Sequence, residues 1–147
     1  MKKILAFLFL TVVALSSCKK SCEEIQRDHI DLGDEYFEFG YAGGFAGGRE
    51  HYVISNGQLF KDSISSTALS TAKLNTAKVL IEHFPALLLS NTNKTYGCRG
   101  CADQITIELR RRISGVVYYW YLDMIVSDLP IELHGYVQEV YDVTRQL

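Results

Sequence analysis

The chain has 147 residues with 15 basic and 17 acidic side chains, and its formal net charge is −2 at pH 7. This length suits one domain with a buried core, while the balanced charge leaves no basic patch of the kind that binds nucleic acid. We therefore expect a single small domain that does not bind nucleic acid.

Residues 1–17 have the composition of a bacterial lipoprotein signal peptide. Two lysines are followed by an apolar run over 4–15, which at about twelve residues is too short to span a bilayer. Two serines then precede Cys18, and this arrangement resembles the lipobox, in which the cysteine receives a diacylglyceryl group before cleavage. We expect lipidation of Cys18, with an ordinary secretory signal as the alternative.

Cleavage before Cys18 would leave a mature chain of 130 residues, attached to a membrane of the bacterial cell envelope through its lipid anchor alone. Lys19 stands where some inner-membrane lipoproteins carry a retaining aspartate, which favours the outer membrane. Residues 18–34 are polar and charged and predict a flexible tether. The folded domain is therefore expected over 35–147.

The start of this domain has the pattern of three antiparallel strands. Alternating aromatic and polar residues indicate a strand over 35–41, and a second strand is expected over 49–55. Asn56-Gly57 is a two-residue hairpin signal that leads into a short returning strand over 58–61.

The first two strands are joined by the glycine-rich sequence Gly43-Gly44-Phe45-Ala46-Gly47-Gly48. A phosphate-binding loop leads from a strand into a helix and, in the P-loop case, carries Gly-Lys-Ser/Thr. This segment instead joins two strands and has no lysine, so its glycines predict a wide turn. Phe45 either packs back onto the sheet or contacts a partner.

The rest of the domain alternates between helical and strand patterns. A helix is expected between 66 and 84, with Ser70 as its N-cap and Pro85 as its end. After a turn-rich loop over 91–100, the sequence predicts strands over 104–113 and 116–125 and an amphipathic helix over 129–147. The order β-β-β-α-β-β-α predicts an α+β fold, in which a single antiparallel sheet of about five strands has two helices packed on one face.

Cys98 and Cys101 are expected to form a disulfide, because an exported protein meets an oxidising environment. A redox dithiol needs an activated thiol, commonly at a helix N-terminus, but a strand follows this Cys-X-X-Cys sequence. A structural zinc site needs four ligands, and the histidines are scattered along the chain. We expect no metal and no cofactor, and Cys22 is left free or paired between molecules.

Two charged or aromatic runs complete the candidate features. Arg110-Arg111-Arg112 is expected at a solvated hairpin tip, with contact to a small anion as the alternative. Residues 118–121 place aromatic side chains on both faces of one strand, so one face belongs to the core and the other can form an exposed patch. A nucleophile, a base and a metal site do not combine anywhere, so we expect no catalytic residues and no enzyme.

Three segments together resemble the emfourin family: Gly43–Gly47, the sequence Ala-Asp-Gln at 102–104, and Leu-Pro-Ile-Glu-Leu at 129–133. Members of this family are small α/β proteins that inhibit thermolysin-type zinc metallopeptidases. The resemblance covers residues 37–147 and implies a secreted zinc metallopeptidase as the partner. The lipoprotein signal, the Cys-X-X-Cys sequence and the arginine-rich hairpin depart from the family pattern. A lipid anchor would place this protein in a different compartment from the proteases that its relatives meet, which weakens the transfer of activity more than that of fold.

The chain is therefore expected to be an envelope-anchored protein-binding lipoprotein, with metallopeptidase inhibition as its most concrete function. Its partner would be contacted through Gly43, Gly44, Phe45, Ala46 and Gly47. The alternative is a structural or accessory lipoprotein that docks an envelope assembly through its Tyr119 and Tyr121 side. An exposed Phe45 favours inhibition, and a broad apolar patch around the two tyrosines favours docking.

Overall fold

The computed structural model of the protein describes residues 32–45, 47–62, 65, 67–98, 103–125, 127 and 129–147. The expected signal peptide, the lipidation site Cys18 and most of the expected tether lie outside these residues, as do Cys22, Ala46 and Cys101. Within the described part of the chain, no helix is both long and apolar enough to cross a membrane.

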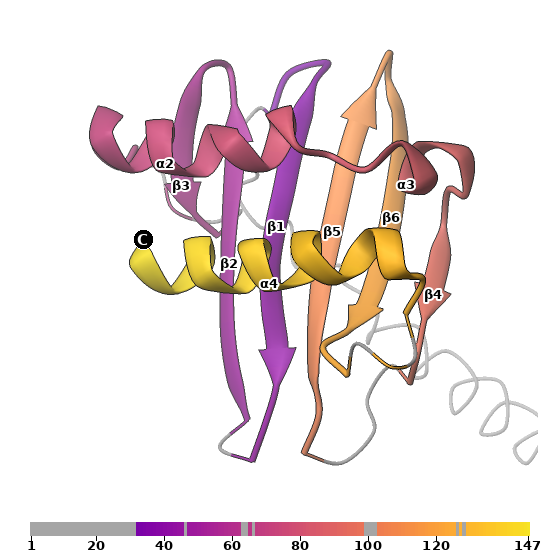
Figure 1. Ribbon diagram of the computed structural model, residues 1–147. Coiled ribbons are helices and arrows are strands. Elements are labelled where there is room, and N and C mark those ends of the chain that lie inside the picture. Colours follow the sequence, from indigo (N-terminus) through magenta and orange to yellow (C-terminus); the bar gives the residue numbers. More distant parts are fainter. Residues whose placement is uncertain are drawn as a thin grey trace, which may run out of the picture.

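The described residues form an α+β fold around one six-stranded sheet, as Figure 1 shows. The strands follow the order β3-β2-β1-β5-β6-β4 across the sheet. Their bounds are β1 Tyr36–Gly43, β2 Gly48–Ser55, β3 Gln58–Lys61, β4 Lys94–Tyr96, β5 Ile105–Ile113 and β6 Val116–Asp123. The α+β class and the single sheet are confirmed, and five of the six strands match expected ones.

The expectation of a purely antiparallel sheet is wrong at one edge. β4 pairs in parallel with β6, with Lys94 opposite Trp120 and Tyr96 opposite Leu122. This strand falls in the segment expected to be a turn-rich loop, and its three residues are too few to show an alternating pattern. The sheet is therefore mixed and has one strand more than expected.

Helices cover one face of the sheet, where α2 (Thr71–Glu82) and α4 (Ile131–Gln146) cross the strands (Figure 1). The expected cap of α2 is confirmed, because the Ser70 hydroxyl accepts a hydrogen bond from the Lys73 amide at 3.5 Å. A third helix, α3 (Ala86–Ser90), was not expected. Pro85 does end α2, but it also serves as the N-cap residue of this short helix.

The core lies between the helices and the covered face of the sheet. Trp120 is fully buried, and its indole N–H lies 3.0 Å from the carbonyl of Leu88 and 2.9 Å from that of Asn91. Phe84, at the end of the α2 segment, makes edge contacts with the rings of Phe37, Trp120 and Tyr136. These contacts tie α2, α3 and α4 to the sheet.

The expected solvated tip of three arginines is wrong for Arg111 and Arg112. All three residues belong to β5, and alternation along a strand sends neighbours to opposite faces. Arg111 points toward the helices, with its guanidinium 5.2 Å from the centre of the Phe84 ring. Arg112 lies on the other face, where it donates to the carbonyl of Gly33 at 3.0 Å.

Candidate functional site

The hairpin between β1 and β2 ends in a glycine turn that exposes Phe45. Gly43, Gly44 and Gly47 have φ values of 107°, 81° and 64°, which lie in the region that side-chain-bearing residues avoid. The Gly47 amide donates to the carbonyl of Gly44 at 2.9 Å. Phe45 is 94% exposed, so of the two roles considered for this ring, packing back onto the sheet is wrong.

The base of this turn is fixed to the neighbouring strand. The Gly44 amide donates to the Gln104 carbonyl at 3.0 Å. A Cβ at Gly43 would lie 2.1 Å from the same carbonyl oxygen, so only glycine permits this close approach. The exposed ring is thus carried by a turn whose base has a defined position, while Ala46 lies outside the described residues.

Cys98, two residues after β4, lies next to the end of β6. Cys98 is disulfide-bonded, but Cys101 is outside the described residues, so their pairing stays a prediction. The buried carboxylate of Asp123 accepts hydrogen bonds from the amides of Cys98 at 3.2 Å and Ile125 at 2.9 Å. Asp123 therefore holds the Cys98 backbone against the end of β6.

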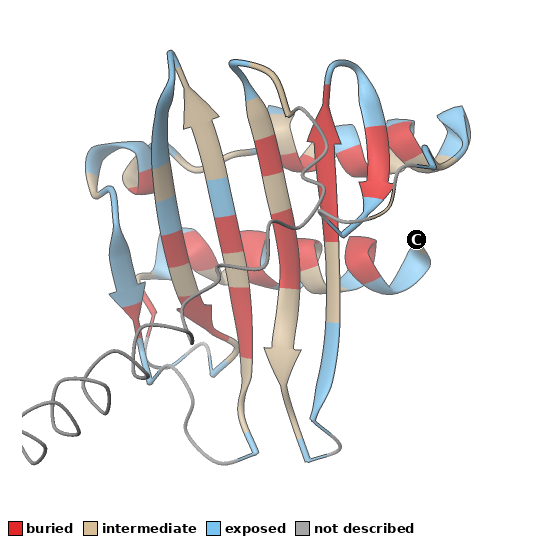
Figure 2. Cartoon of the chain, turned by 180° about the vertical axis from the view of Figure 1, so that it is seen from behind, coloured by how far each residue is buried: buried red, intermediate tan, exposed pale blue. Residues whose placement is uncertain are grey.

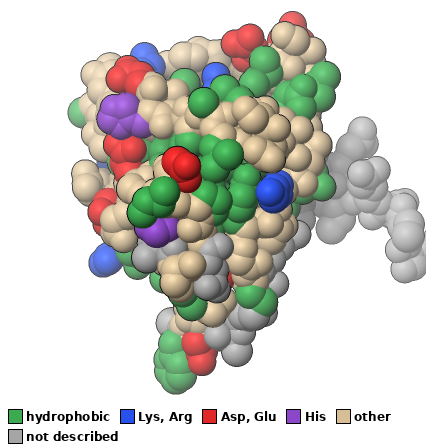
Figure 3. Space-filling model, turned by 45° about the vertical axis from the view of Figure 1, so that its right-hand side comes forward, with side chains coloured by type: hydrophobic (Ala, Val, Ile, Leu, Met, Phe, Trp, Pro, Cys, Tyr) green, Lys and Arg blue, Asp and Glu red, His purple; other side chains and the backbone are tan. Residues whose placement is uncertain are grey.

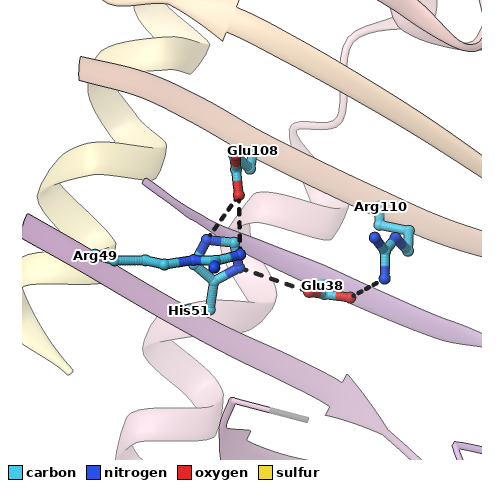
Figure 4. Close-up of polar contacts among 5 residues, drawn as sticks. All are labelled: Glu38, Arg49, His51, Glu108 and Arg110. Atoms are coloured by element: carbon cyan, nitrogen blue, oxygen red, sulfur yellow. Dashed lines mark hydrogen bonds and ion pairs between the residues drawn. The ribbon is translucent and has the colours of Figure 1, made fainter. Parts of the chain in front are cut away.

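Figure 2 shows the open face of the sheet, which we define as the face opposite α2 and α4. This face carries a charged cluster (Figure 4). His51 on β2 lies between two carboxylates: its Nδ1 is 3.5 Å from Glu38 Oε1 on β1, and its Nε2 is 3.0 Å from Glu108 Oε2 on β5. The Nε2 contact departs from hydrogen-bond geometry, so the attraction there is electrostatic. The cluster joins three adjacent strands.

Gly40 is what allows His51 to reach across β1. It stands opposite His51 on one side and opposite Glu108 on the other. A Cβ at this position would lie 2.0 Å from the carbonyl oxygen of Glu50, so β1 and β2 could not keep their spacing with any larger residue. The bare backbone at Gly40 leaves room for the imidazole between the two flanking strands.

Two arginines flank the cluster and complete its charge pairing. Arg110 Nη1 donates to Glu38 Oε2 at 3.2 Å, and Arg49 Nη2 lies 3.5 Å from Glu108 Oε2. Burial alone would lower the pKa of His51, but its contacts with Glu108 and Glu38 outweigh burial and raise this pKa. Burial would likewise raise the pKa of Glu38, yet His51 and Arg110 outweigh it and lower that pKa. Each group thus favours the charged form of its neighbour.

A shallow pocket of about 250 Å³ lies over this cluster, with Tyr119 and Tyr121 of β6 on its side. The two tyrosine rings lie 5.7 Å apart. Tyr119 is 42% exposed, but Arg110 stands opposite it and Glu108 stands opposite Tyr121. The expected aromatic side is therefore interleaved with charges and is not a broad apolar patch.

A second hollow lies between α4 and the α2–α3 junction. It measures about 420 Å³ and is lined by His83, Pro85, Ala86, Leu87, Glu132, Tyr136 and Glu139. Figure 3, in which the α3 and β4 side comes forward, shows hydrophobic side chains gathered among acidic residues and histidines. His83 Nδ1 and Glu139 Oε1, 2.8 Å apart, join the two helices there.

Sequence reasoning missed the charged cluster. It treated His51 as one of several scattered histidines, and it placed Arg110 at a hairpin tip. The available signal was alternation, because Glu38, Arg49, His51, Glu108 and Arg110 occupy the polar positions of expected strands. Among the described residues, no group of three or more His, Cys, Asp or Glu side chains is arranged to hold a metal ion.

Comparison with protein-family models, curated proteins and solved structures found no match for this chain. The resemblance to the emfourin family therefore stays a prediction.

Proposed function

We propose that this chain is a protein-binding domain and not an enzyme, and that the β1–β2 hairpin tip with Phe45 is the centre of its contact surface. The observation that supports this proposal is the 94% exposure of a phenylalanine on a turn with a fixed base. An exposed aromatic side chain supplies a large contact area at a small entropic cost, and aromatic anchors of this kind dominate interfaces.

The partner class follows from the sequence resemblance. If the likeness to emfourins extends to activity, the partner is a secreted thermolysin-type zinc metallopeptidase, and the hairpin enters or covers its cleft. Lipidation of Cys18 would hold the inhibitor on the envelope, at the outer membrane. The signal sequence over 1–18 and Lys19 support the anchoring and its membrane, and the three motifs support the partner class.

The alternative is an accessory lipoprotein that docks through the open face. Tyr119 and Val117, 42% and 39% exposed, support it. Docking of this kind buries a broad apolar patch. The charges beside Tyr119 interrupt the apolar surface here. We therefore favour the hairpin.

Inhibition is tested by titrating the mature chain, carrying Cys18→Ser for solubility, against a panel of thermolysin-type metallopeptidases. We expect inhibition of at least one enzyme at micromolar concentration or below. Loss of inhibition on Phe45→Ala would place the contact at the hairpin. Absence of inhibition across the panel would exclude the protease-inhibitor proposal and favour the accessory-lipoprotein alternative.

A further inference from the structure

The pocket on the open face has a charged floor and a basic rim. Its floor holds Glu38, His51 and Glu108, whose side chains are 15%, 10% and 18% exposed. Its rim holds Arg49 and Arg110, whose side chains are 69% and 49% exposed. The carboxylates are thus turned inward and paired, while the guanidinium groups meet solvent. A molecule that enters the pocket meets positive charge first.

The charge count of the pocket depends on His51. With His51 protonated, three cationic groups, namely His51, Arg49 and Arg110, face the two carboxylates of Glu38 and Glu108. One positive charge is then in excess. A guanidinium has five N–H donors in a planar fork that suits a carboxylate. The two rim arginines therefore have N–H donors with which to bind an anionic group, in addition to the glutamates that they already contact.

The size of the pocket limits what this group can be. A volume of about 250 Å³ is smaller than the roughly 300–1,000 Å³ of drug-sized ligand sites. Tyr119 and Tyr121 line one side with ring surface, against which a planar or apolar body can pack. A pocket of this volume and lining suits a single acidic side chain or a small aromatic acid.

We propose that this pocket is a binding site for a carboxylate group, held by the guanidinium groups of Arg49 and Arg110 against the rings of Tyr119 and Tyr121. The carboxylate comes either from a free small acid or from an acidic side chain of the protein partner. The site is separate from Phe45, so it extends the proposed function and does not depend on it.

Binding at this site is expected to weaken as pH rises. The ionisable groups beside His51 are Glu38 on β1, Arg49 on β2, and Glu108 and Arg110 on β5, while β6 adds the two tyrosines. Asp62, directly after β3, also lies beside His51, because its amide donates to the His51 carbonyl at 2.8 Å. The two glutamates raise the pKa of His51, so the imidazolium persists to higher pH than in a free histidine. Loss of its proton removes the excess positive charge, and the attraction for an anion falls.

The probe for this site is benzoate, with neutral benzamide as its isosteric control. In an NMR titration of the mature Cys18→Ser chain, we expect benzoate to shift the Tyr119 and His51 ring signals in a saturable way and benzamide to bind at least about tenfold more weakly. The affinity for benzoate should fall as the pH passes the pKa of His51. Equal binding of both probes, or no saturable shift, would overturn the proposal.

Variants locate the binding groups. Arg49→Gln changes an exposed side chain and should weaken benzoate binding about tenfold. Arg145→Gln is the matched control, because Arg145 also lies over a tyrosine ring, 5.6 Å from Tyr141 on α4; it should bind benzoate as the wild type does. Equal losses in both variants would contradict the site.

The source of the carboxylate is decided by competition. If a partner protein supplies it, benzoate should displace that partner and Arg49→Gln should weaken the complex; if a free acid is the ligand, partner and benzoate should bind together. Phe45→Ala should leave benzoate binding unchanged. Failure of the carboxylate site is therefore distinguishable from failure of the hairpin proposal.

Discussion

His51 is a nearly buried ionisable side chain on the open face of the sheet. It lies between Glu38 and Glu108, and the side chain is only 10% exposed. Such a site would be unfavourable for a lone imidazolium, because burial penalises charge. The two carboxylates reverse this balance, so His51 joins β1, β2 and β5 by charge as well as by backbone hydrogen bonds.

This coupling predicts a pH-dependent contribution to stability. The pKa of His51 is raised in the folded state, so the folded chain binds this proton more tightly than the unfolded chain. The stabilisation is fully present below the unfolded-state pKa of about 6.5 and is lost as pH rises through the folded-state value. The difference in unfolding free energy between wild type and His51→Gln should therefore shrink across this range in denaturant titrations.

Glu108→Gln provides the matched test of the cause. Removing this carboxylate should lower the pKa of His51, measured by NMR of the ring protons, because Glu108 raises it. A His51 pKa that stays at or below that of a free histidine in the wild type would contradict the cluster.

Single residues also show the limit of sequence reasoning. The exposed role of Phe45 was one of two open alternatives, because a turn sequence does not say which way a ring points. Alternation places Glu38, His51 and Glu108 at polar strand positions, but it does not predict their contact. The three residues are far apart in the chain and meet only when the register of three strands is known. Gly40 looks like an ordinary strand residue until that register is fixed.

At the scale of elements, local signals predicted most of the fold. The α2 segment begins after Ser70 and ends before Pro85, as expected, and the Asn56-Gly57 turn joins β2 to β3. The two elements that the sequence did not predict are β4, with three residues, and α3, with five. Both are too short for a period to emerge. The parallel pairing of β4 is a long-range contact that no local pattern encodes.

The β1–β2 pairing offers a sharp test at Gly40. Because an added Cβ would meet the Glu50 carbonyl at 2.0 Å, Gly40→Ala must push the two strands apart or twist them. We expect a loss of about 1–3 kcal/mol of unfolding free energy, measured by chemical denaturation.

Gly135→Ala is the control for that substitution. Gly135 lies within α4, and an added Cβ there meets nothing within 4 Å. Since alanine favours a helix over glycine, this variant should be more stable by about 0.5–1 kcal/mol. Two variants of equal stability would contradict the tight approach described at Gly40.

At the scale of the whole molecule, the helices and the proposed contact surfaces occupy different parts of the domain. α2 and α4 cover one face of the sheet, and the turn between β1 and β2 lies at one end of the sheet (Figure 1). The charged pocket lies on the open face, and the exposed Phe45 belongs to the β1–β2 turn. A partner can therefore contact the hairpin without disturbing the core.

The attachment of the molecule is tested at Cys18. Each buried methylene of an acyl chain contributes about 0.8 kcal/mol, and one chain alone binds a membrane only marginally. The several chains of a lipoprotein should therefore place the wild type in the membrane fraction, and Cys18→Ser should move it to the soluble fraction. Continued membrane association of Cys18→Ser, seen by fractionation and immunoblot, would contradict lipid anchoring at this residue.

The central claim is that Phe45 anchors a protein partner. Its most direct test is the dissociation constant of the inhibited metallopeptidase, or of the protein that copurifies with the intact lipoprotein, for wild type, Phe45→Ala and Ile131→Ala. Ile131 is the matched control, since it is also a large exposed apolar residue, 73% exposed, at the start of α4. We predict that Phe45→Ala weakens binding about 30-fold, or about 2 kcal/mol, while Ile131→Ala has no effect. Equal affinities for wild type and Phe45→Ala would contradict the account.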